Sequence, residues 1–271
     1  MQYKGNLILN FLFILLITSL TAQDKIDIEN DYQAKENDWR FIISPYALLA
    51  GNATDVGGDR IRQSFTDLTS LTNFGFMLNA QVMYRKWVLL ADGTYANLGA
   101  NTGEGIVQVD LDLKQYMLDL RLGYNVYINI DTDGDVIRGW ALEVNAGAKH
   151  WKNDVTIDYK IQLESPPPLL EGSLKEPLSW WDMMLGVKAR IFLSRSVLLG
   201  LYASGGGFGI GNSSNFSWDF SYTNTFKVSD LISITAGYRT LRYTRVDGEG
   251  DQALETSVSI FGPMLGVSFV F

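Results

Sequence analysis

The chain has no cysteine and only one histidine, His150, among its 271 residues. Without cysteine there can be no disulfide framework, no thiolate metal site, no cysteine nucleophile and no lipid anchor of the lipoprotein type. A single histidine rules out a site built from several histidine ligands. We therefore expect neither a metal ion nor any other cofactor.

Basic residues are also scarce, since 22 Lys and Arg stand against 30 Asp and Glu and give a formal net charge of −8. Phosphate contacts need concentrated Lys and Arg, so this balance argues against a protein that binds nucleic acid. Sequence signatures of enzymes are missing too, because there is no G-x-S-x-G, no zinc motif and no Rossmann glycine pattern. We expect no enzymatic activity.

The N-terminus carries the pattern of an export signal. Lys4 provides a positive start, residues 7–17 form an apolar stretch interrupted only by Asn10, and small or polar residues follow up to Ala22. This pattern predicts a secretory signal peptide over residues 1–22, used in Sec-type export. The polar and charged residues 23–38 predict a flexible periplasmic leader ahead of one domain over residues 39–271.

Alternation with period 2 dominates that domain. Between Tyr116 and Tyr124, large apolar residues occupy every second position, and 140–148 and 181–193 repeat the pattern. Strict alternation predicts strands rather than helices. The ten segments of this kind are 39–50, 74–84, 87–97, 106–128, 138–161, 179–193, 196–208, 214–227, 231–245 and 255–271.

The connections between these segments differ in length at the two ends. Short links at 85–86, 194–195 and 228–230, with a turn at 131–135, alternate with longer ones at 51–73, 98–105, 162–178, 209–213 and 246–254. Short turns on one side and long loops on the other are typical of an outer-membrane β-barrel. We predict an all-β fold, a closed antiparallel up-and-down transmembrane β-barrel of about 10 strands, with 8–12 possible.

Several local features bear on how such a barrel would close. Pro45 and Pro263 each remove a ladder hydrogen bond, and both would lie at the closure seam of a simple up-and-down barrel. The glycine-rich run 205–211 predicts a bent strand end at the outer rim. The alternation slips between Leu113 and Tyr116, which predicts a β-bulge at Lys114 and Gln115.

The apolar face of the strands carries aromatic residues suited to the membrane–water boundary. They are Tyr84, Trp87, Tyr95, Tyr116, Tyr124, Trp140, Trp181 and Tyr238. The last strand ends with Phe269 and Phe271, which resembles the signal read by the barrel-assembly machinery of Gram-negative outer membranes. Outer-membrane lipid, lipopolysaccharide and that machinery are the partners expected; the ligand is unknown.

The opposite face carries charge and would line the lumen. Its predicted members are Asp92, Asp119, Arg121, Glu143, Lys149, Asp182, Lys188, Arg190 and Arg239. Unpaired charges in a narrow barrel would cost several kcal/mol each, so these residues should pair with one another. They would form either a plug that stabilises the barrel or the lining of a polar conduit or ligand pocket.

Several runs along the chain resemble a family of poorly characterised Gram-negative outer-membrane barrels, similar in general architecture to the small OmpA- and OmpW-like barrels. They are Asp67-Leu68 with Phe74–Met77, Trp87 with Asp92 and Tyr95, Asp110–Gln115 with Gly123-Tyr124, Gly205–Gly209, Ala236–Arg239 and Gly262–Gly266. The resemblance covers residues 39–271 and implies the fold and an outer-membrane location, but no mechanism.

We therefore expect a structural role or the passive passage of a small solute. One alternative is a surface adhesin or receptor that acts through loops 51–73 and 162–178. The other is a lipid-modifying outer-membrane enzyme, in which His150 would need a serine and an acid as partners. His150 has the right height for that chemistry, but its neighbours Lys149 and Trp151 do not make a triad.

Overall fold

The computed structural model describes residues 39–56, 59–63, 72–104, 107–133, 136–162, 169–248 and 253–271. The predicted signal peptide and leader lie outside the described residues and stay predictions. Within the described ranges, no helix is long and apolar enough to cross a membrane. The strands are β1 (Trp39–Leu48), β2 (Gly51–Val56), β3 (Asp59–Gln63), β4 (Thr72–Tyr84), β5 (Trp87–Glu104), β6 (Val107–Asp133), β7 (Val136–Gln162), β8 (Leu169–Phe192), β9 (Val197–Gly206), β10 (Phe216–Lys227), β11 (Ile232–Asp247) and β12 (Leu254–Val270).

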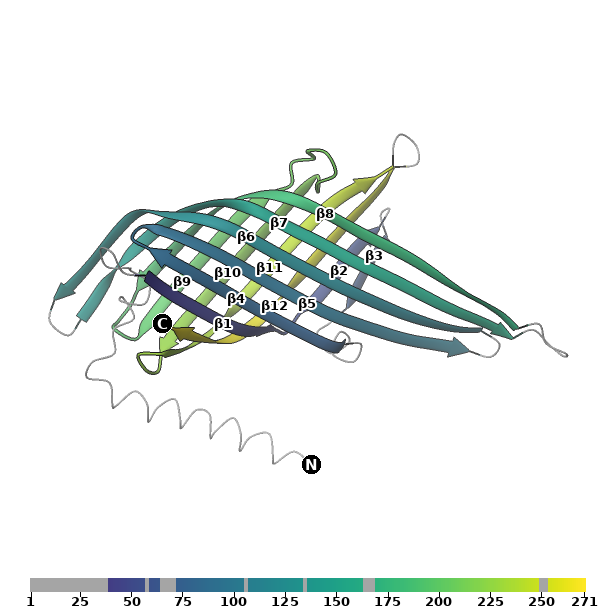
Figure 1. The fold of residues 1–271 in the computed structure, drawn as a ribbon, viewed down its shortest axis with the longest axis horizontal. Coiled ribbons are helices and arrows are strands. Elements are labelled where there is room, and N and C mark those ends of the chain that lie inside the picture. The colour runs from purple at the N-terminus through teal and green to yellow at the C-terminus, as the bar shows by residue number, and fades with distance from the viewer. Residues whose placement is uncertain are drawn as a thin grey trace, which may run out of the picture.

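Ten of these strands close a barrel (Figure 1). From β4 to β12 each strand pairs antiparallel with the next in the chain, and β1 joins the two ends of the series by pairing with both β4 and β12. The predicted closed up-and-down barrel is thereby confirmed, and each of the ten predicted segments falls on one of its strands. Pro45 and Pro263 do lie on the two strands that meet at the closure.

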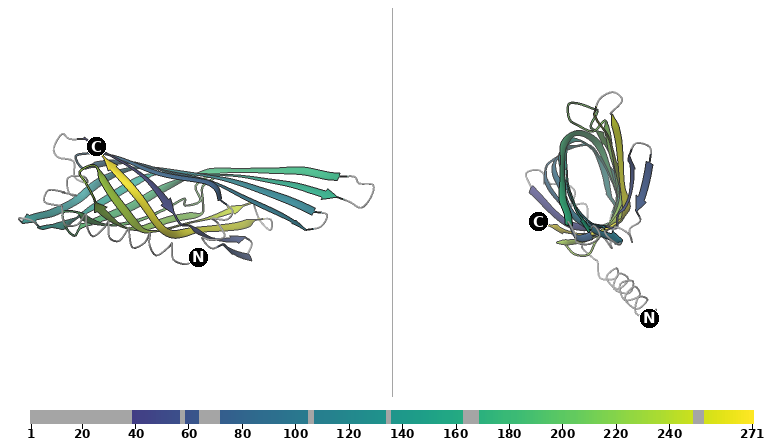
Figure 2. Two further views of the ribbon diagram at one scale, coloured as in Figure 1. Left: turned by 90° about the horizontal axis from the view of Figure 1, so that it is seen from below. Right: turned by 90° about the vertical axis from the view of Figure 1, so that its right-hand side faces the viewer.

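The strands β2 and β3 stand outside this ring. They form a hairpin that continues from β1 and pairs with the N-terminal part of β12, where Val56 lies opposite Thr256. Seen along the barrel axis, the hairpin stands beside the oval ring (Figure 2, right). The link 51–73, expected to be a loop, thus contains a hairpin that extends one side of the wall.

The two ends of the barrel differ as predicted. Tight turns at Arg85–Lys86, Ser194–Ser196 and 228–231 join strands at the end where Trp39 and Phe271 lie. By the usual rule for such barrels, we expect this end to face the periplasm, and we call it the periplasmic end. At the other end β9 stops at Gly206, and positive φ angles at three of the following glycines, including Gly207, form the predicted rim turn.

The structure corrects the predicted loops 98–105 and 162–178. Strand β5 continues to Glu104, β7 to Gln162, and β8 begins at Leu169, so that most of these residues belong to a sheet that projects beyond the barrel (Figure 1). Both faces of a projecting strand meet water, so it needs no apolar alternation and has the composition of a loop.

The predicted bulge at Lys114 and Gln115 is also wrong. Both residues keep a regular register with β5 and β7, and the register shift in β6 lies between Asn125 and Tyr127 instead. The alternation slips near Leu113 because the strand leaves the apolar belt there. Lipid no longer selects apolar side chains for the outer face, and Leu113 packs on the inner side of the projecting sheet, opposite Val155.

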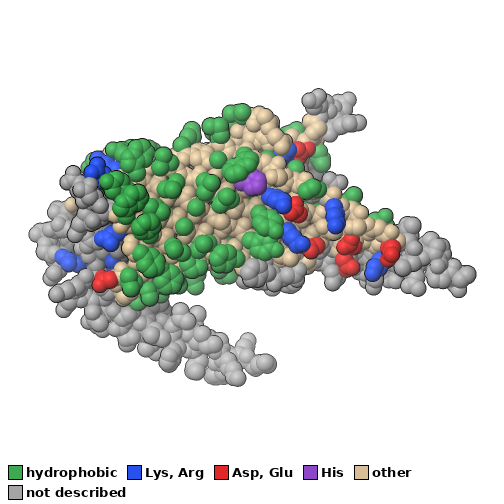
Figure 3. Space-filling view, in the orientation of Figure 1, with side chains coloured by type: hydrophobic (Ala, Val, Ile, Leu, Met, Phe, Trp, Pro, Cys, Tyr) green, Lys and Arg blue, Asp and Glu red, His purple; other side chains and the backbone are tan. Residues whose placement is uncertain are grey.

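The outer surface carries the apolar side chains and the interior carries the charges. Leu120 is 41% exposed, whereas its neighbours Asp119 and Arg121 are 1% and 6% exposed. Exposed apolar side chains cover the middle of the barrel, and charged ones gather beyond them at the projecting end (Figure 3). A soluble barrel has the opposite arrangement, so this surface is that of a transmembrane barrel.

The predicted interface aromatics are on the outer face, most of them in pairs across neighbouring strands. Towards the periplasmic end, ring centroids lie 4.6 Å apart for Trp39–Tyr84, 4.8 Å for Trp87–Tyr124 and 4.4 Å for Tyr127–Trp140. Towards the projecting end, the ring centroids of Tyr95 and Tyr116 lie 4.8 Å apart and those of Trp181 and His150 lie 4.6 Å apart, both pairs tilted. Tyr238 lies opposite Tyr222.

The interior is filled in layers. At the periplasmic end, a buried apolar cluster lies between the strands that flank the tight turns; its members are Ile42, Met83, Val88, Ala141, Phe192, Leu198 and Val270. At the other end, a second cluster holds Met117, Trp151, Trp180, Leu241, Tyr243 and Val258. We call these the lower and the upper apolar cluster. The charged residues lie between them.

The placement of the apolar belt can be tested with one substitution made at two heights. Leu120→Arg should destabilise the folded barrel in lipid vesicles by about 2–4 kcal/mol, because it places a charge in hydrocarbon. Leu174→Arg, on the projecting part of β8 and 51% exposed, should change the free energy of unfolding by less than about 0.5 kcal/mol. Urea unfolding measures both. Equal costs at the two positions would contradict the placement of the apolar belt.

Candidate functional site

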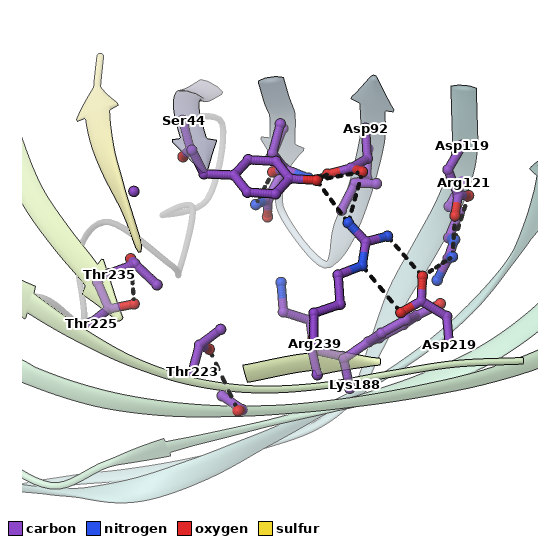
Figure 4. Close-up of a pocket in the computed structure, with 18 of the residues that line it drawn as sticks. Ser44, Asp92, Asp119, Arg121, Lys188, Asp219, Thr223, Thr225, Thr235 and Arg239 are labelled. Carbon is purple, nitrogen blue, oxygen red and sulfur yellow. Dashed lines mark hydrogen bonds and ion pairs between the residues drawn. The ribbon is translucent and has the colours of Figure 1, made fainter. Parts of the chain in front are cut away.

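The candidate site is the charged layer of the lumen, with Arg239 of β11 at its centre (Figure 4). The guanidinium donates to both oxygens of Asp219, at 2.7 Å from Nη2 and 3.2 Å from Nε. Its Nη1 lies 3.1 Å from Asp92 and 2.7 Å from the Tyr46 hydroxyl. One cation thereby joins two carboxylates that come from β5 and β10, on different sides of the lumen.

Asp219 connects this centre to a second group of ion pairs. Lys149 Nζ lies 2.9 Å from Asp219 and 3.3 Å from Asp119. Asp119 is also bound by Arg121, whose Nε lies 2.6 Å from Oδ1. All of these groups are buried. Each carboxylate in this part of the lumen thus faces at least one cation, which offsets the cost of removing it from water.

A further pair lies nearer the periplasmic side. Arg190 Nη2 is 3.4 Å from Glu143 and donates to the side-chain oxygen of Asn125. Lys188 lies on the same inner face of β8 and lines the polar cavity described below. These residues continue the charged layer towards the lower apolar cluster.

Asp182 differs from the other carboxylates because neutral donors surround it. It accepts hydrogen bonds from the Trp151 indole at 2.9 Å, and from the backbone N–H and hydroxyl of Ser214 at 2.7 and 2.9 Å. The sequence-based expectation that Asp182 joins the same charge network as Arg239 therefore does not describe its closest contacts. Asp182 instead binds Trp151 of the upper apolar cluster directly, and it reaches Trp180 through Ser214, whose hydroxyl accepts from the Trp180 indole at 2.9 Å.

The nine predicted lumen residues all lie on the inner faces of their strands. Sequence reasoning missed Asp219, Tyr46 and Asn79, which donates to Asp92 at 3.0 Å. The signal for Asp219 was present, since Phe216, Trp218 and Phe220 alternate with Ser217 and Asp219 on β10. With Asp219 added, these inner-face residues comprise five carboxylates and five cations, and Asp182 is the carboxylate among them that neutral donors bind.

Next to these ion pairs lies a polar cavity of about 170 Å³. Its walls include Lys188, Arg239, Asp219 and several hydroxyl side chains, among them Thr223 and Thr225 (Figure 4). Among its lining residues are four carboxylates, Asp92, Asp119, Glu143 and Asp219, and three cations, Arg121, Lys188 and Arg239. Arg121 pairs with Asp119, and Arg239 pairs with Asp92 and Asp219. Within the described part of the chain, no cluster of three or more metal-ligating side chains is present.

His150 lies outside this site, on the outer face at the edge of the apolar belt. Its Nε2 is 2.8 Å from the Ser179 hydroxyl, and its ring lies tilted against that of Trp181. Among the described residues, no ion pair joins His150 to a carboxylate. The contact brings together a histidine and a serine, two of the three members of a catalytic triad, without the acid that a serine esterase would need.

Comparison with known proteins gave matches only at the level of structure. No protein-family model matches the chain, and no curated protein matches it by sequence. The similar structures include the outer membrane protease OmpT from Escherichia coli (10% identity, TM-score 0.46, covering 88% of this chain and 98% of that one). They also include the attachment invasion locus protein Ail of Yersinia pestis (13%, 0.37, 86% and 98%) and Neisserial surface protein A (11%, 0.33, 86% and 99%). No functional residue is carried over from them.

Arg239→Ala tests the energetic weight of the central cation. The substitution leaves Asp92 and Asp219 buried with fewer partners and should destabilise the barrel by about 3–5 kcal/mol. Arg242→Ala on the outer face of the same strand should cost less than about 1 kcal/mol. Adding Asp219→Asn to Arg239→Ala should cost less than the sum of the two single changes. Strict additivity in urea unfolding would show that the two residues are not coupled.

Proposed function

We propose that the protein is an outer-membrane barrel of a Gram-negative cell, exported through the Sec pathway, whose lumen is closed. Its role in the membrane is structural rather than the passage of a solute. The exposed apolar belt with its aromatic borders supports the location. Phe269 on β12 and Phe271 directly after that strand, both exposed, suit the proposed recognition by the barrel-assembly machinery. Phe271 and Phe41 exchange backbone hydrogen bonds and close the ring at this end.

The observation that carries this proposal is that two layers of side chains, one charged and one apolar, fill the lumen. The charged layer around Arg239 crosses the barrel. Below it lies the buried lower apolar cluster, which includes Met83, Phe192 and Val270. An ion that entered from outside would have to separate buried ion pairs and then cross an apolar layer that cannot hydrate it. Two barriers in series favour a closed barrel over a conduit.

Single-channel recording in planar bilayers tests the closed lumen. The unmodified protein should show no stepwise current, and Arg239→Ala should stay closed because the apolar layer remains. Combining Arg239→Ala with Met83→Ala and Phe192→Ala should open a conducting path, since both barriers are then reduced. Heat-modifiable migration on gels confirms that each variant is folded.

Two outcomes of this recording count against the proposal. Regular conductance steps from the unmodified protein would mean that the lumen is an open conduit. Steps from Arg239→Ala alone would mean that the lower apolar cluster is not a barrier.

A second candidate function is that of a surface receptor or adhesin, and the projecting sheet favours it. From His150 at the edge of the belt, β7 continues to Gln162, roughly 40 Å along the strand at the usual rise per residue. The outer faces of this part carry exposed charged residues such as Lys160, Glu171 and Lys175. The projecting strands β5–β8, rather than loops 51–73 and 162–178 as such, would form the contact surface.

Cysteine labelling on intact cells tests the orientation that both functions require. The chain has no native cysteine, so Ser173→Cys on the projecting part of β8 gives a single target. A membrane-impermeant maleimide should label it in intact cells. Ser229→Cys, in the turn between β10 and β11, should react only after the outer membrane is permeabilised. The reverse pattern would show that the projecting sheet faces the periplasm.

A further inference from the structure

As far as the described residues show, the barrel wall is unpaired along part of one seam. Strand β1 pairs with β4 from Trp39–Tyr84 up to Tyr46–Met77, and the pairing stops there. Beyond this point the chain follows β12 instead, through Leu48 and then through β2. Of the described residues, none pairs with 72–76 of β4 on the side away from β5.

The divergence begins where the chain bends between β1 and β2. The backbone of Leu49 and Ala50 passes directly over Gly262 of β12, and a Cβ at Gly262 would meet the carbonyl of Leu49. Leu49 N–H donates to the Pro263 carbonyl at 2.9 Å, which fixes the bend against β12. The hairpin β2–β3 therefore leads away from β4, and the seam between them stays unpaired.

A cavity of about 280 Å³ lies at this seam. On one side its lining runs without interruption from Tyr46 to Ala50, and on the other it includes Gly75 and Met77 of β4. Successive residues of a strand point to opposite faces. Because inward-facing Leu48 and outward-facing Ala47 of β1 both line it, we infer that the cavity reaches from the lumen to the outer face of the wall.

The chemistry of the lining is apolar. Met117, Trp151, Leu241 and Ile260 form the inner wall, three of them from the upper apolar cluster. At the bottom, Arg239 and the Tyr46 hydroxyl are already engaged with Asp92 and Asp219. A charged ligand would therefore find no free counter-charge there, whereas an apolar ligand fits the walls. The volume is about twice that of an apolar cavity known to accept benzene.

The opening lies at the height of the aromatic border nearest the projecting sheet. Tyr95, whose ring contacts that of Tyr116 at that border, is also part of the lining. Aromatic rings of this kind sit at the boundary between hydrocarbon and headgroups. A molecule dissolved in the outer leaflet can therefore reach the cavity from the side, without passing through the aqueous end of the barrel.

We propose that the cavity between β1–β2 and β4 is a binding site for an uncharged hydrophobic ligand that enters sideways from the outer leaflet. The ligand has an apolar body, either a free hydrophobic compound or one acyl chain of a membrane lipid. This site lies above the charged layer, so it does not depend on whether the lumen below conducts ions.

Filling the cavity tests the site itself. The probe is N-phenyl-1-naphthylamine, a neutral apolar fluorophore, read by energy transfer from tryptophan in detergent-solubilised folded protein. Leu48→Trp should raise its apparent Kd at least about tenfold, and Leu241→Phe, from the opposite wall, should act in the same direction. The matched control is Ile43→Trp, which adds the same side chain to the outer face of β1 and should leave binding unchanged. Unchanged binding in both filling variants would overturn the proposal.

Closing the seam tests the entrance. Continuing the register beyond Tyr46–Met77 makes Ala47 and Phe76 the next opposed residues, so Ala47→Cys with Phe76→Cys can be joined by oxidation or a short bismaleimide. The joined protein should take up the probe at least about tenfold more slowly, and the disulfide form should recover on reduction. Ile43→Cys with Ala80→Cys, joined where the strands already pair, is the control. Uptake at the original rate would overturn lateral entry.

Native mass spectrometry of protein released from lipid nanodiscs distinguishes the two kinds of ligand, a membrane lipid and a free hydrophobic compound. A lipid retained by the unmodified protein and lost in Leu48→Trp identifies an acyl chain as the ligand. Probe binding without any retained lipid identifies a free hydrophobic compound. If the unmodified protein retains no lipid and binds no probe, the cavity is not a binding site.

Discussion

The hydrocarbon layer offers no hydrogen bonds, and this constraint determines how the chain closes on itself. Every backbone group within it must pair inside the sheet, so the last strand has to find the first. That closure uses β12 against β1. The two strands are unequal, with 17 and 10 residues, and the surplus length of β12 pairs with β2. Closure is thus complete on the β12 side and incomplete on the β4 side, which places the open seam at the outer end of the wall.

The interior follows from the same geometry. A narrow ring leaves room for side chains but not for bulk water, so the charges that the inner face carries must neutralise one another. Arg239 lies within reach of two carboxylates from different strands, Asp92 and Asp219. Lys149 extends the network from Asp219 to Asp119. The apolar layers above and below limit access of water to these pairs. The lower one seals the periplasmic end, and the upper one leaves an apolar cavity that opens to the side.

The two ends of the barrel differ in structure. Tight turns at the periplasmic end hold the closed ring together, and the lower apolar cluster packs just inside them. At the other end, β5–β8 continue far beyond the belt while β9–β12 and β1 stop earlier. The wall is therefore high on one side and low and partly open on the other. Both proposed surfaces, the projecting sheet and the lateral cavity, belong to this uneven outer half.

The sequence alone determined the ten strands that form the ring and their two faces, because period 2 repeats the same in-out choice at every residue. The nine charges predicted for the lumen lie on its inner face for that reason, and Asp219 could have been found from the alternation around Trp218. Only the tertiary structure decided what each charge meets: Arg239 and Asp92 are 147 positions apart in the chain, and no local pattern encodes that contact. It also decided where the membrane ends on each strand. Outside lipid the outer face no longer has to be apolar, so the pattern around Leu113 suggested a bulge, and strands at 98–104 and 169–178 had the composition of loops.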